Sequence, residues 1–281
     1  MGDVLAGIHA TWEFESDSVL IRFERGIRTP KLFQALRERR VPHEALESVT
    51  LSPGKRGTVV LHAVPRPGAD PLMEAAAGQL KDSGDPYRLV LPAERETLAE
   101  YYADELRAAL TTKEPADRHL VAPPPAPLNF KAYDGKASFD GSKVSFRWFW
   151  TGASSAKWKA GDQRFAVSEL SGVEWRSPEV FDGYLRLLRH GDHEQPAQAD
   201  HDPAAVVFGL GYGPVHESLP FAAAVLAAVR KSGPVPVPVP VGRRDPADIA
   251  ERIRHLGELH EAGLVTDEEF SAKKAELLSE L

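Results

Sequence analysis

Apolar and polar residues alternate with a period of two in several segments, which is the pattern of half-buried β-strands. The clearest examples run from Val19 to Phe23 and from Val144 to Trp150. Further strands are predicted at Thr58–Val64, Tyr87–Leu91, Tyr184–Leu188 and Ala205–Leu210. The polar turns Glu15-Ser16-Asp17 and Asp140-Gly141 precede the first two segments and predict hairpins.

Two later segments change to a helical period. Apolar residues recur at helical spacing at Leu98, Tyr102, Leu106, Ala109 and Leu110, and again at Phe221, Val225 and Val229. Each segment follows a group of predicted strands, so an amphipathic helix ends each half of the chain.

The two halves resemble one another in sequence. The pairs Phe14/Phe139, Val19/Val144, Arg22/Arg147 and Phe23/Trp148 share an offset of 125 residues, Leu46/Leu170 and Val49/Val173 an offset of 124, and Ala103/Ala222, Leu106/Val225 and Ala109/Ala228 an offset of 119. Leu89 also matches Phe208. Because the matches keep their order and the offset drifts by only six residues, we interpret them as two copies of one domain.

Two proline tracts divide the chain. We predict a first copy at 1–115, a proline-rich linker at 116–127, a second copy at 128–232, a Val/Pro spacer at 233–244 and a tail at 245–281. Alternating valine and proline favours stiff polyproline II, so the second tract is interpreted as a spacer; a ligand for a proline-recognising domain is the alternative.

The tail has the pattern of a helical hairpin. Asp245 and Pro246 begin one helix, Gly263 ends it, and Thr266 with Glu269 forms a capping box for the next. An apolar stripe runs along both helices at Ile249, Ile253, Leu256, Leu259, Phe270, Leu277 and Leu278. A hairpin of this size buries too little apolar surface to be stable alone, so we expect the stripe to be an oligomer interface with a second copy of the chain.

Composition narrows the function classes. The chain lacks cysteine, which excludes disulfides and thiolate chemistry. Its net charge is −7; the tail carries ten acids and four bases, and the other 244 residues carry 31 acids and 30 bases. The body is therefore nearly neutral, and no nucleic-acid partner is expected. The longest apolar run, Phe221 to Val229, is too short to span a bilayer, and the first residues show no secretory signal, so a cytoplasmic location is expected.

The motifs of the chain resemble known families. The tail, above all Leu256 to Phe270 and Lys273 to Leu278, resembles a SHOCT domain. The stretch from Gly68-Ala69-Asp70-Pro71-Leu72 through Asp85-Pro86-Tyr87 to Leu106 is similar to an actinobacterial family of unknown function, a PH-like domain that occurs in tandem before a SHOCT tail. The resemblance implies an α+β fold: two PH-like barrels of antiparallel strands, each closed by a C-terminal helix, plus a C-terminal helical hairpin.

The candidate sites for chemistry are weak. The loop His190-Gly191-Asp192-His193-Glu194, with Asp200-His201-Asp202, has metal-ligand residue types, but its glycine and prolines favour a solvated loop. Gly209 to Pro214 lacks the lysine and hydroxyl residue of a phosphate-binding loop, so a strand-to-helix turn is favoured. The five tryptophans fall mostly in strand patterns and are interpreted as core or barrel-edge residues. We predict no catalytic residues, no cofactor and no metal, and hence no enzyme.

One dense basic stretch remains, formed by Arg25, Arg28, Lys31, Arg37, Arg39 and Arg40. Resemblance to PH-like domains implies that such residues contact phosphate or anionic lipid, and Lys157, Lys159 and Arg164 with Trp158 occupy a similar place in the second copy. Acidic residues interrupt the run, which favours a solvated surface. We therefore expect a binding and assembly protein that oligomerises through its tail; the alternative is a peripheral module at the inner membrane face.

Overall fold

The computed structural model describes residues 3–180, 182–191 and 198–233. These residues form one compact unit that contains both copies of the repeat. The predicted tail hairpin and most of the Val/Pro spacer lie outside the described residues.

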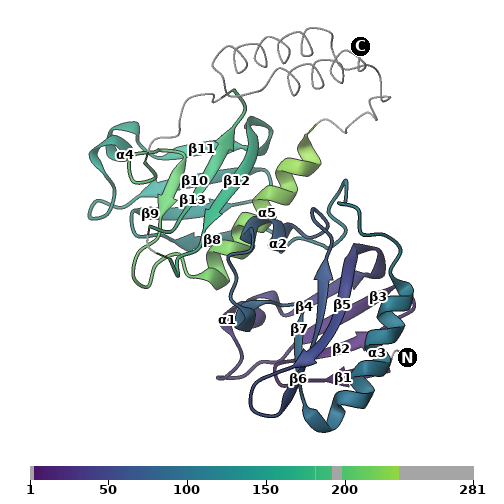
Figure 1. The fold of residues 1–281 in the computed structure, drawn as a ribbon. Helices are drawn as coiled ribbons and strands as arrows, with labels where there is room; N and C mark the ends of the chain where they lie inside the picture. The colour runs from purple at the N-terminus through teal and green to yellow at the C-terminus, as the bar shows by residue number, and fades with distance from the viewer. Residues whose placement is uncertain (1–2, 181, 192–197, 234–281) are drawn as a thin grey trace, which may run out of the picture. The chain divides into compact units, whose positions relative to one another are not determined.

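The first copy consists of seven antiparallel strands and three α-helices (Figure 1). In chain order they are β1 (Asp3–Ala6), β2 (Ala10–Phe14), β3 (Ser18–Phe23), α1 (Lys31–Leu36), β4 (Glu38–Pro42), β5 (Leu46–Pro53), β6 (Thr58–Pro65), α2 (Pro71–Ala76), β7 (Arg88–Pro92) and α3 (Glu96–Ala109). The second copy repeats the order of the strands and of the first and last helices. Its elements are β8 (Leu128–Lys131), β9 (Gly135–Phe139), β10 (Lys143–Trp148), α4 (Ser155–Ala160), β11 (Gln163–Ala166), β12 (Leu170–Arg176), β13 (Tyr184–Arg189), β14 (Ala205–Val207) and α5 (Val215–Ser232).

Each copy contains two separate sheets. A four-stranded sheet has the order β1-β2-β3-β4 in the first copy and β11-β10-β9-β8 in the second, and a three-stranded sheet is formed by β5-β6-β7 or β12-β13-β14. The mixed α+β class and the antiparallel pairing are confirmed. The expectation of a closed barrel is wrong in one respect: among the described residues, strand pairing does not continue from one sheet into the other.

Backbone details support the internal repeat. In each copy a short 3₁₀ turn, His43–Ala45 or Val167–Glu169, leads directly into the three-stranded sheet. The first strand of that sheet then shifts register at the same place, between Leu46 and Ser48 in β5 and between Leu170 and Gly172 in β12. A shared bulge at equivalent positions shows that both sequences fold on one backbone plan.

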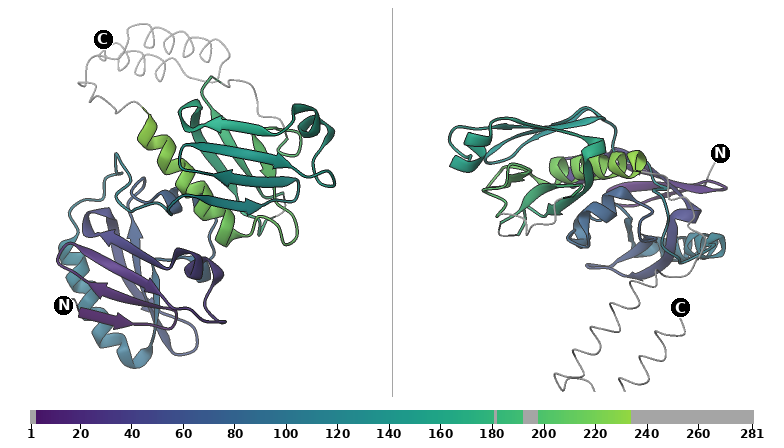
Figure 2. Two further views of the ribbon diagram at one scale, coloured as in Figure 1. Left: turned by 180° about the vertical axis from the view of Figure 1, so that it is seen from behind. Right: turned by 90° about the horizontal axis from the view of Figure 1, so that it is seen from above.

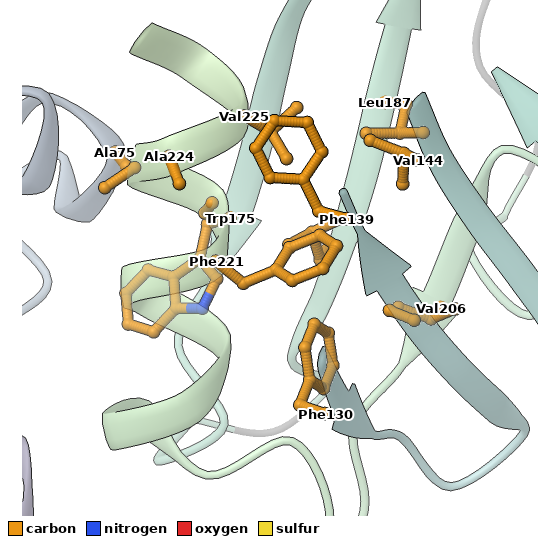
Figure 3. Packing of buried hydrophobic residues seen from close by; sticks show 14 of the residues in the cluster. Ala75, Phe130, Phe139, Val144, Trp175, Leu187, Val206, Phe221, Ala224 and Val225 are labelled. Carbon is orange, nitrogen blue, oxygen red and sulfur yellow. The ribbon is translucent and has the colours of Figure 1, made fainter. Parts of the chain in front are cut away.

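The C-terminal helix of each copy buries one face against its own strands. In the first copy α3 contributes Ala99, Tyr102, Ala103 and Leu106 to the core, and in the second α5 contributes Ser218, Phe221, Ala222 and Val225. Figure 3 shows Phe221 of α5 among Phe130, Phe139 and Trp175 of the second copy. Burial of these apolar side chains is the main force that holds helix and strands together.

The two terminal helices differ on their other face. In α5, Leu219, Ala223 and Ala224 are also buried. At an offset of 119 residues, the corresponding positions of α3 are Glu100, Asp104 and Glu105, all exposed. A helix with apolar residues on two opposite faces packs against protein on both faces, because exposing either face to water would be unfavourable. The second cover on α5 comes from α1 and α2 of the first copy, whose Leu32, Leu72, Ala75 and Ala76 belong to the same core cluster. Figure 3 shows Ala75 of α2 beside Ala224 of α5.

The predicted linker is folded against the first copy. Ala116 and Val121 are buried in that copy's core. The N–H of Ala116 donates to Pro67 O, and the N–H groups of Leu120 and Val121 donate to Ala69 O. This part of the chain therefore completes the first copy before the second begins at β8.

The two copies lie side by side along α5, which both views of Figure 2 show between the strands of the second copy and the helices of the first.

Candidate interaction surfaces

The predicted basic stretch does not form one accessible surface. Arg25, Arg28, Lys31 and Arg37 are exposed. Arg39, in contrast, is only 5% exposed, because it pairs with Ile21 across the sheet and so lies on the inward-facing side of β4. Arg40 points to the other side, where it binds Glu15 and Ser18. The prediction that Arg39 contacts a phosphate or lipid at the surface is therefore wrong.

Arg39 belongs to a buried polar network. Its Nη2 donates to Asp70 Oδ1 over 2.5 Å, and the hydroxyl of Tyr87 donates to Asp70 Oδ2 over 2.6 Å. Burial raises the pKa of Tyr87 well above its ordinary value, so the phenol keeps its proton and remains a donor. The network ties β4 and the start of β7 to the residue that begins α2.

Asp70 also caps α2. Its Oδ1 accepts the N–H of Leu72, and Pro71 occupies the first helical position, where the absent N–H costs nothing. The Asp-Pro-Leu part of the family motif is thus explained by structure: it starts the short helix that packs on α5. The sequence of the second copy has no such stretch.

Polar contacts surround the packing of α2 on α5. Oε2 of Glu74 lies 2.9 Å from both His119 Nε2 and Arg230 Nη1. The amide of Gln79 bonds to the backbone on both sides of Arg176: its Nε2 donates to Trp175 O, and its Oε1 accepts the N–H of Ser177. These contacts fix the register of the first copy on the second.

A cavity of about 470 Å³ lies where the copies meet. It is bordered by Lys31 and Lys81 of the first copy and by the turn Gly209–Tyr212 and His216 of the second. Lys81 is engaged with Glu179, and burial lowers the pKa of His216. The turn before α5 connects a strand to a helix, as predicted from the sequence. Gly211 and Gly213 in this turn adopt positive φ angles, which glycine accepts without strain.

The second copy has its own buried ion pair. Lys157 is fully buried, and its Nζ donates to Asp134 Oδ2 over 2.5 Å. The ammonium also lies 5.1 Å from the ring centre of Trp148. Asp134 Oδ1 accepts the N–H of Val207, so the pair joins α4 to β14. Lys157 is therefore a structural residue, and the expectation that it belongs to a basic surface is wrong; Lys159 and Arg164 are exposed.

Exposed aromatic side chains gather at one end of the second copy. Trp150 is 76% exposed and Trp158 is 49% exposed, and their rings meet edge to face at 5.0 Å. Tyr133 and Tyr212 form a second exposed pair. A Cβ at Gly152 would clash with the carbonyl oxygen of Tyr133, which places the turn after Trp150 directly on the turn that carries Tyr133.

These positions correct the interpretation of the tryptophans. Trp12, Trp148 and Trp175 are buried as expected. Trp150 is not, because β10 ends at Trp148 and the following residues form a loop. The strand predicted from the sequence therefore ended two residues too late, at Trp150 instead of Trp148. We refer to Tyr133, Trp150, Trp158 and Tyr212 as the aromatic end.

The candidate metal loop is only partly described. Both carboxylate oxygens of Asp202 accept hydrogen bonds within the fold. Oδ2 accepts one from Arg186 Nε, and Oδ1 accepts one from the N–H of Ala204. His201 Nδ1 lies 2.8 Å from Asp200 Oδ1. Among the described residues no group of three potential ligands lies close enough to hold a metal ion. His190 is described, and its N–H donates to Glu169 O. The remaining candidate ligands, Asp192, His193 and Glu194, lie outside the described residues.

The hydrophobic helices are short. No helix in the described part of the chain has the length and apolar character to cross a membrane. The most apolar one, α5, is occupied by the two packing faces described above.

Comparisons with known proteins agree with the repeat. A family model described as a domain of unknown function (DUF4429) matches residues 12–107 and again residues 137–226. A second model, a short C-terminal domain (SHOCT), matches residues 251–278. A comparison with curated proteins finds no match. The two predicted resemblances and the tandem arrangement are confirmed.

Proposed function

The chain belongs to the DUF4429 family, with two copies of its domain before a SHOCT domain, and from this premise we propose that it is a non-enzymatic binding and assembly protein. In this proposal the two PH-like copies act as one body that presents a binding surface. The SHOCT tail gathers copies of the chain into an oligomer.

The observation that carries the binding role is the aromatic end. Tyrosine and tryptophan bury large areas at little entropic cost and are enriched at interaction sites. Trp150, at 76% exposure, leaves most of a large apolar ring in water, which is unfavourable unless a partner covers it. The buried ion pairs also favour a binding role over catalysis. Arg39–Asp70 and Lys157–Asp134 connect structural elements and are assigned to the stability of the fold.

The assembly role rests on the tail sequence. Its apolar stripe, from Ile249 to Leu278, needs cover that a short hairpin does not provide. The alternative role, membrane contact through residues 25–40, loses support because Arg39 is buried and Arg40 is paired.

Light scattering tests the assembly role. We expect the full chain to have a mass that is a multiple of one chain, and a chain without residues 242–281 to have the mass of a monomer. Leu256→Asp should dissociate the oligomer as well, because it places a charge in the apolar stripe, whereas Glu258→Ala on the polar side should leave the mass unchanged. An oligomer that survives both the deletion and Leu256→Asp contradicts the proposed role of the tail.

A further inference from the structure

The outer face of the four-stranded sheet in the second copy carries only basic charge. Its outward positions alternate with the buried residues of β8 to β11, and they include Lys131, Lys136, Lys143, Arg147 and Arg164. The other outward positions on these strands are Asn129, Ser138, Ser145 and Ala166. The five basic positions are called the basic face below. Its outward positions include no acid.

The register brings three of the charges into one row. Lys136 is directly opposite Lys131 on one side and Arg147 on the other. Neighbouring strands are about 4.8 Å apart, so the row spans roughly 10 Å. Like charges placed directly opposite each other destabilise a sheet. A row of this kind therefore works against stability, and an anionic partner would offset the repulsion.

Four of the five charges have no ion-pair partner within the described residues, and the fifth, Lys143, interacts electrostatically with Asp140. None of Lys131, Lys136, Arg147 and Arg164 forms an ion pair there. Three acids in the adjoining turns bind backbone N–H groups. Asp140 accepts those of Ser142 and Lys143, Asp162 accepts that of Trp148, and Glu169 accepts that of Ala166.

The first copy provides an internal comparison. On the same face of its sheet the charges are balanced: Arg22, the counterpart of Arg147, binds Glu13 and lies 3.8 Å from Glu38, and Arg40 binds Glu15. The outer face of the sheet is thus electrically neutralised in the first copy and not in the second, although the two copies share one backbone plan. The difference lies in the side chains of the second copy, not in the fold.

The exposed tryptophans lie at the end of this face. The row of Lys131, Lys136 and Arg147 is the last outward row before β10 ends, and Trp150 follows Arg147 by three residues. Trp158 lies in α4, which connects β10 to β11. Tryptophan is the residue that favours the boundary between lipid headgroups and hydrocarbon.

We propose that the basic face, with Trp150 and Trp158 at its end, binds the surface of an anionic lipid bilayer. This inference rests on the proposed binding role and names the partner of the second copy, but it does not depend on self-association by the tail. Lysine and arginine side chains near an anionic membrane contribute about 1 kcal/mol each, so five charges suffice for salt-sensitive adsorption.

A nucleic acid fits the face less well. Sheets that bind single strands carry aromatic side chains between their basic residues, so that bases stack on them. Here the positions between the charges are Ser138, Ser145 and Asn129, and the two tryptophans meet edge to face beyond the end of the sheet. Diffuse attraction to a planar charged surface requires no such stacking positions.

Co-sedimentation of the full chain with vesicles tests the proposal. Phosphatidylcholine vesicles with phosphatidylserine should bind the protein at low salt and release it at high salt, and vesicles of phosphatidylcholine alone should not bind it. Lys136→Gln with Arg147→Gln should lower the partition coefficient about thirtyfold, since each lost charge is worth about fivefold. Removing two like-charged neighbours should not lower the unfolding temperature, so a loss of binding will not reflect unfolding.

The matched control is Arg25→Gln with Arg28→Gln, which removes the same charge from the predicted basic stretch of the first copy. It should reduce vesicle binding much less than the variant of the basic face. Trp150→Ser should also weaken binding at low salt, because it removes an apolar side chain from the boundary between headgroups and hydrocarbon. Equal losses in the two double variants, or equal binding to neutral vesicles, would overturn the proposal. So would binding of a duplex or single-stranded oligonucleotide that depends on Lys136 and Arg147 when vesicles do not bind.

These results separate the two proposals. Failure of vesicle binding with an intact oligomer refutes the lipid partner alone, and loss of the oligomer in light scattering with normal vesicle binding refutes the role of the tail alone.

Discussion

Arg39 and Asp70 form an ion pair in which both side chains are almost completely buried, with 2.5 Å between nitrogen and oxygen. The pair connects the inward side of β4 to the cap of α2. Since α2 packs on α5, this contact within the first copy also shapes the surface on which the second copy rests.

Breaking that pair should destabilise the protein strongly. Arg39→Met leaves the Asp70 carboxylate buried without its cation, which costs about 3–5 kcal/mol of unfolding free energy. Arg40→Met, at the next position, removes an exposed pair with Glu15 and a hydrogen bond to Ser18, and should cost less than about 1 kcal/mol. Urea unfolding of the two variants measures both values. Similar losses would show that the buried network contributes little.

Ala224→Glu should separate the copies. It gives α5 the residue that α3 has at the corresponding position, Glu105, and places a carboxylate against Ala75 of α2 (Figure 3). A buried charge without a partner should cost more than about 2 kcal/mol and should split the unfolding transition into two. The reciprocal change, Glu105→Ala, lies at the surface and should stay within about 0.5 kcal/mol of the parent protein. A single unshifted transition in Ala224→Glu would mean that the interface between the copies contributes little.

Lys157→Met should make stability depend on pH. Burial raises the pKa of Asp134 above its ordinary value of 3.8, and Lys157 lowers it. Without the lysine the pKa rises further, and the folded state holds the proton more tightly than the unfolded state. Stability is then complete below the unfolded pKa and falls as the pH rises through the folded pKa.

The measurement is the unfolding free energy between about pH 4 and pH 8. Lys159→Met removes an exposed lysine from the same helix and is the control. The parent protein and Lys159→Met should have similar profiles over this range, and a Lys157→Met profile parallel to theirs would contradict the prediction.

Glu74 should contribute stability that acid removes. Its hydrogen bond with His119 lowers the pKa of Glu74 below 4.5, and Arg230 acts in the same direction. A depressed carboxyl pKa gives stabilisation that is present above the unfolded pKa and is lost as the pH falls through the folded pKa. The difference in unfolding free energy between the parent protein and Glu74→Gln should therefore shrink in acid. A difference that stays constant down to about pH 2 would show that Glu74 does not titrate as described.

The sequence already contained a sign of the interface between α5 and the first copy. The offset of 119 residues aligns Leu219, Ala223 and Ala224 with Glu100, Asp104 and Glu105. This difference was an available signal that the second helix is covered on both sides and the first on one, although it does not say which element covers the second. The element that covers it, α2, lies about 150 residues earlier in the chain. Asp70 caps the start of α2, and Glu74 of α2 binds Arg230 of α5.

The basic residues illustrate the opposite case. The run from Arg25 to Arg40 suggested a basic surface because its charges are close in sequence. The alternation of side chains along β4, however, places Arg39 inward and Arg40 outward. The five charges of the basic face are spread from Lys131 to Arg164 and become neighbours only through cross-strand pairing. The alternation Lys143-x-Ser145-x-Arg147 was the available signal, because it marks one side of a strand.

The sequence by itself determined the tandem repeat, the antiparallel strands with a terminal helix in each copy, and the family. These features follow from local periodicity and from motifs that neighbouring residues carry. Within the described residues, only the tertiary structure decided that each copy has two sheets rather than a closed barrel and that Arg39 and Lys157 are buried with carboxylates. It also decided that four cations without an ion-pair partner among those residues share one sheet face. Such outcomes depend on contacts between residues far apart in the chain, where the burial of a charge or its neutralisation is set by the partner that folding brings to it.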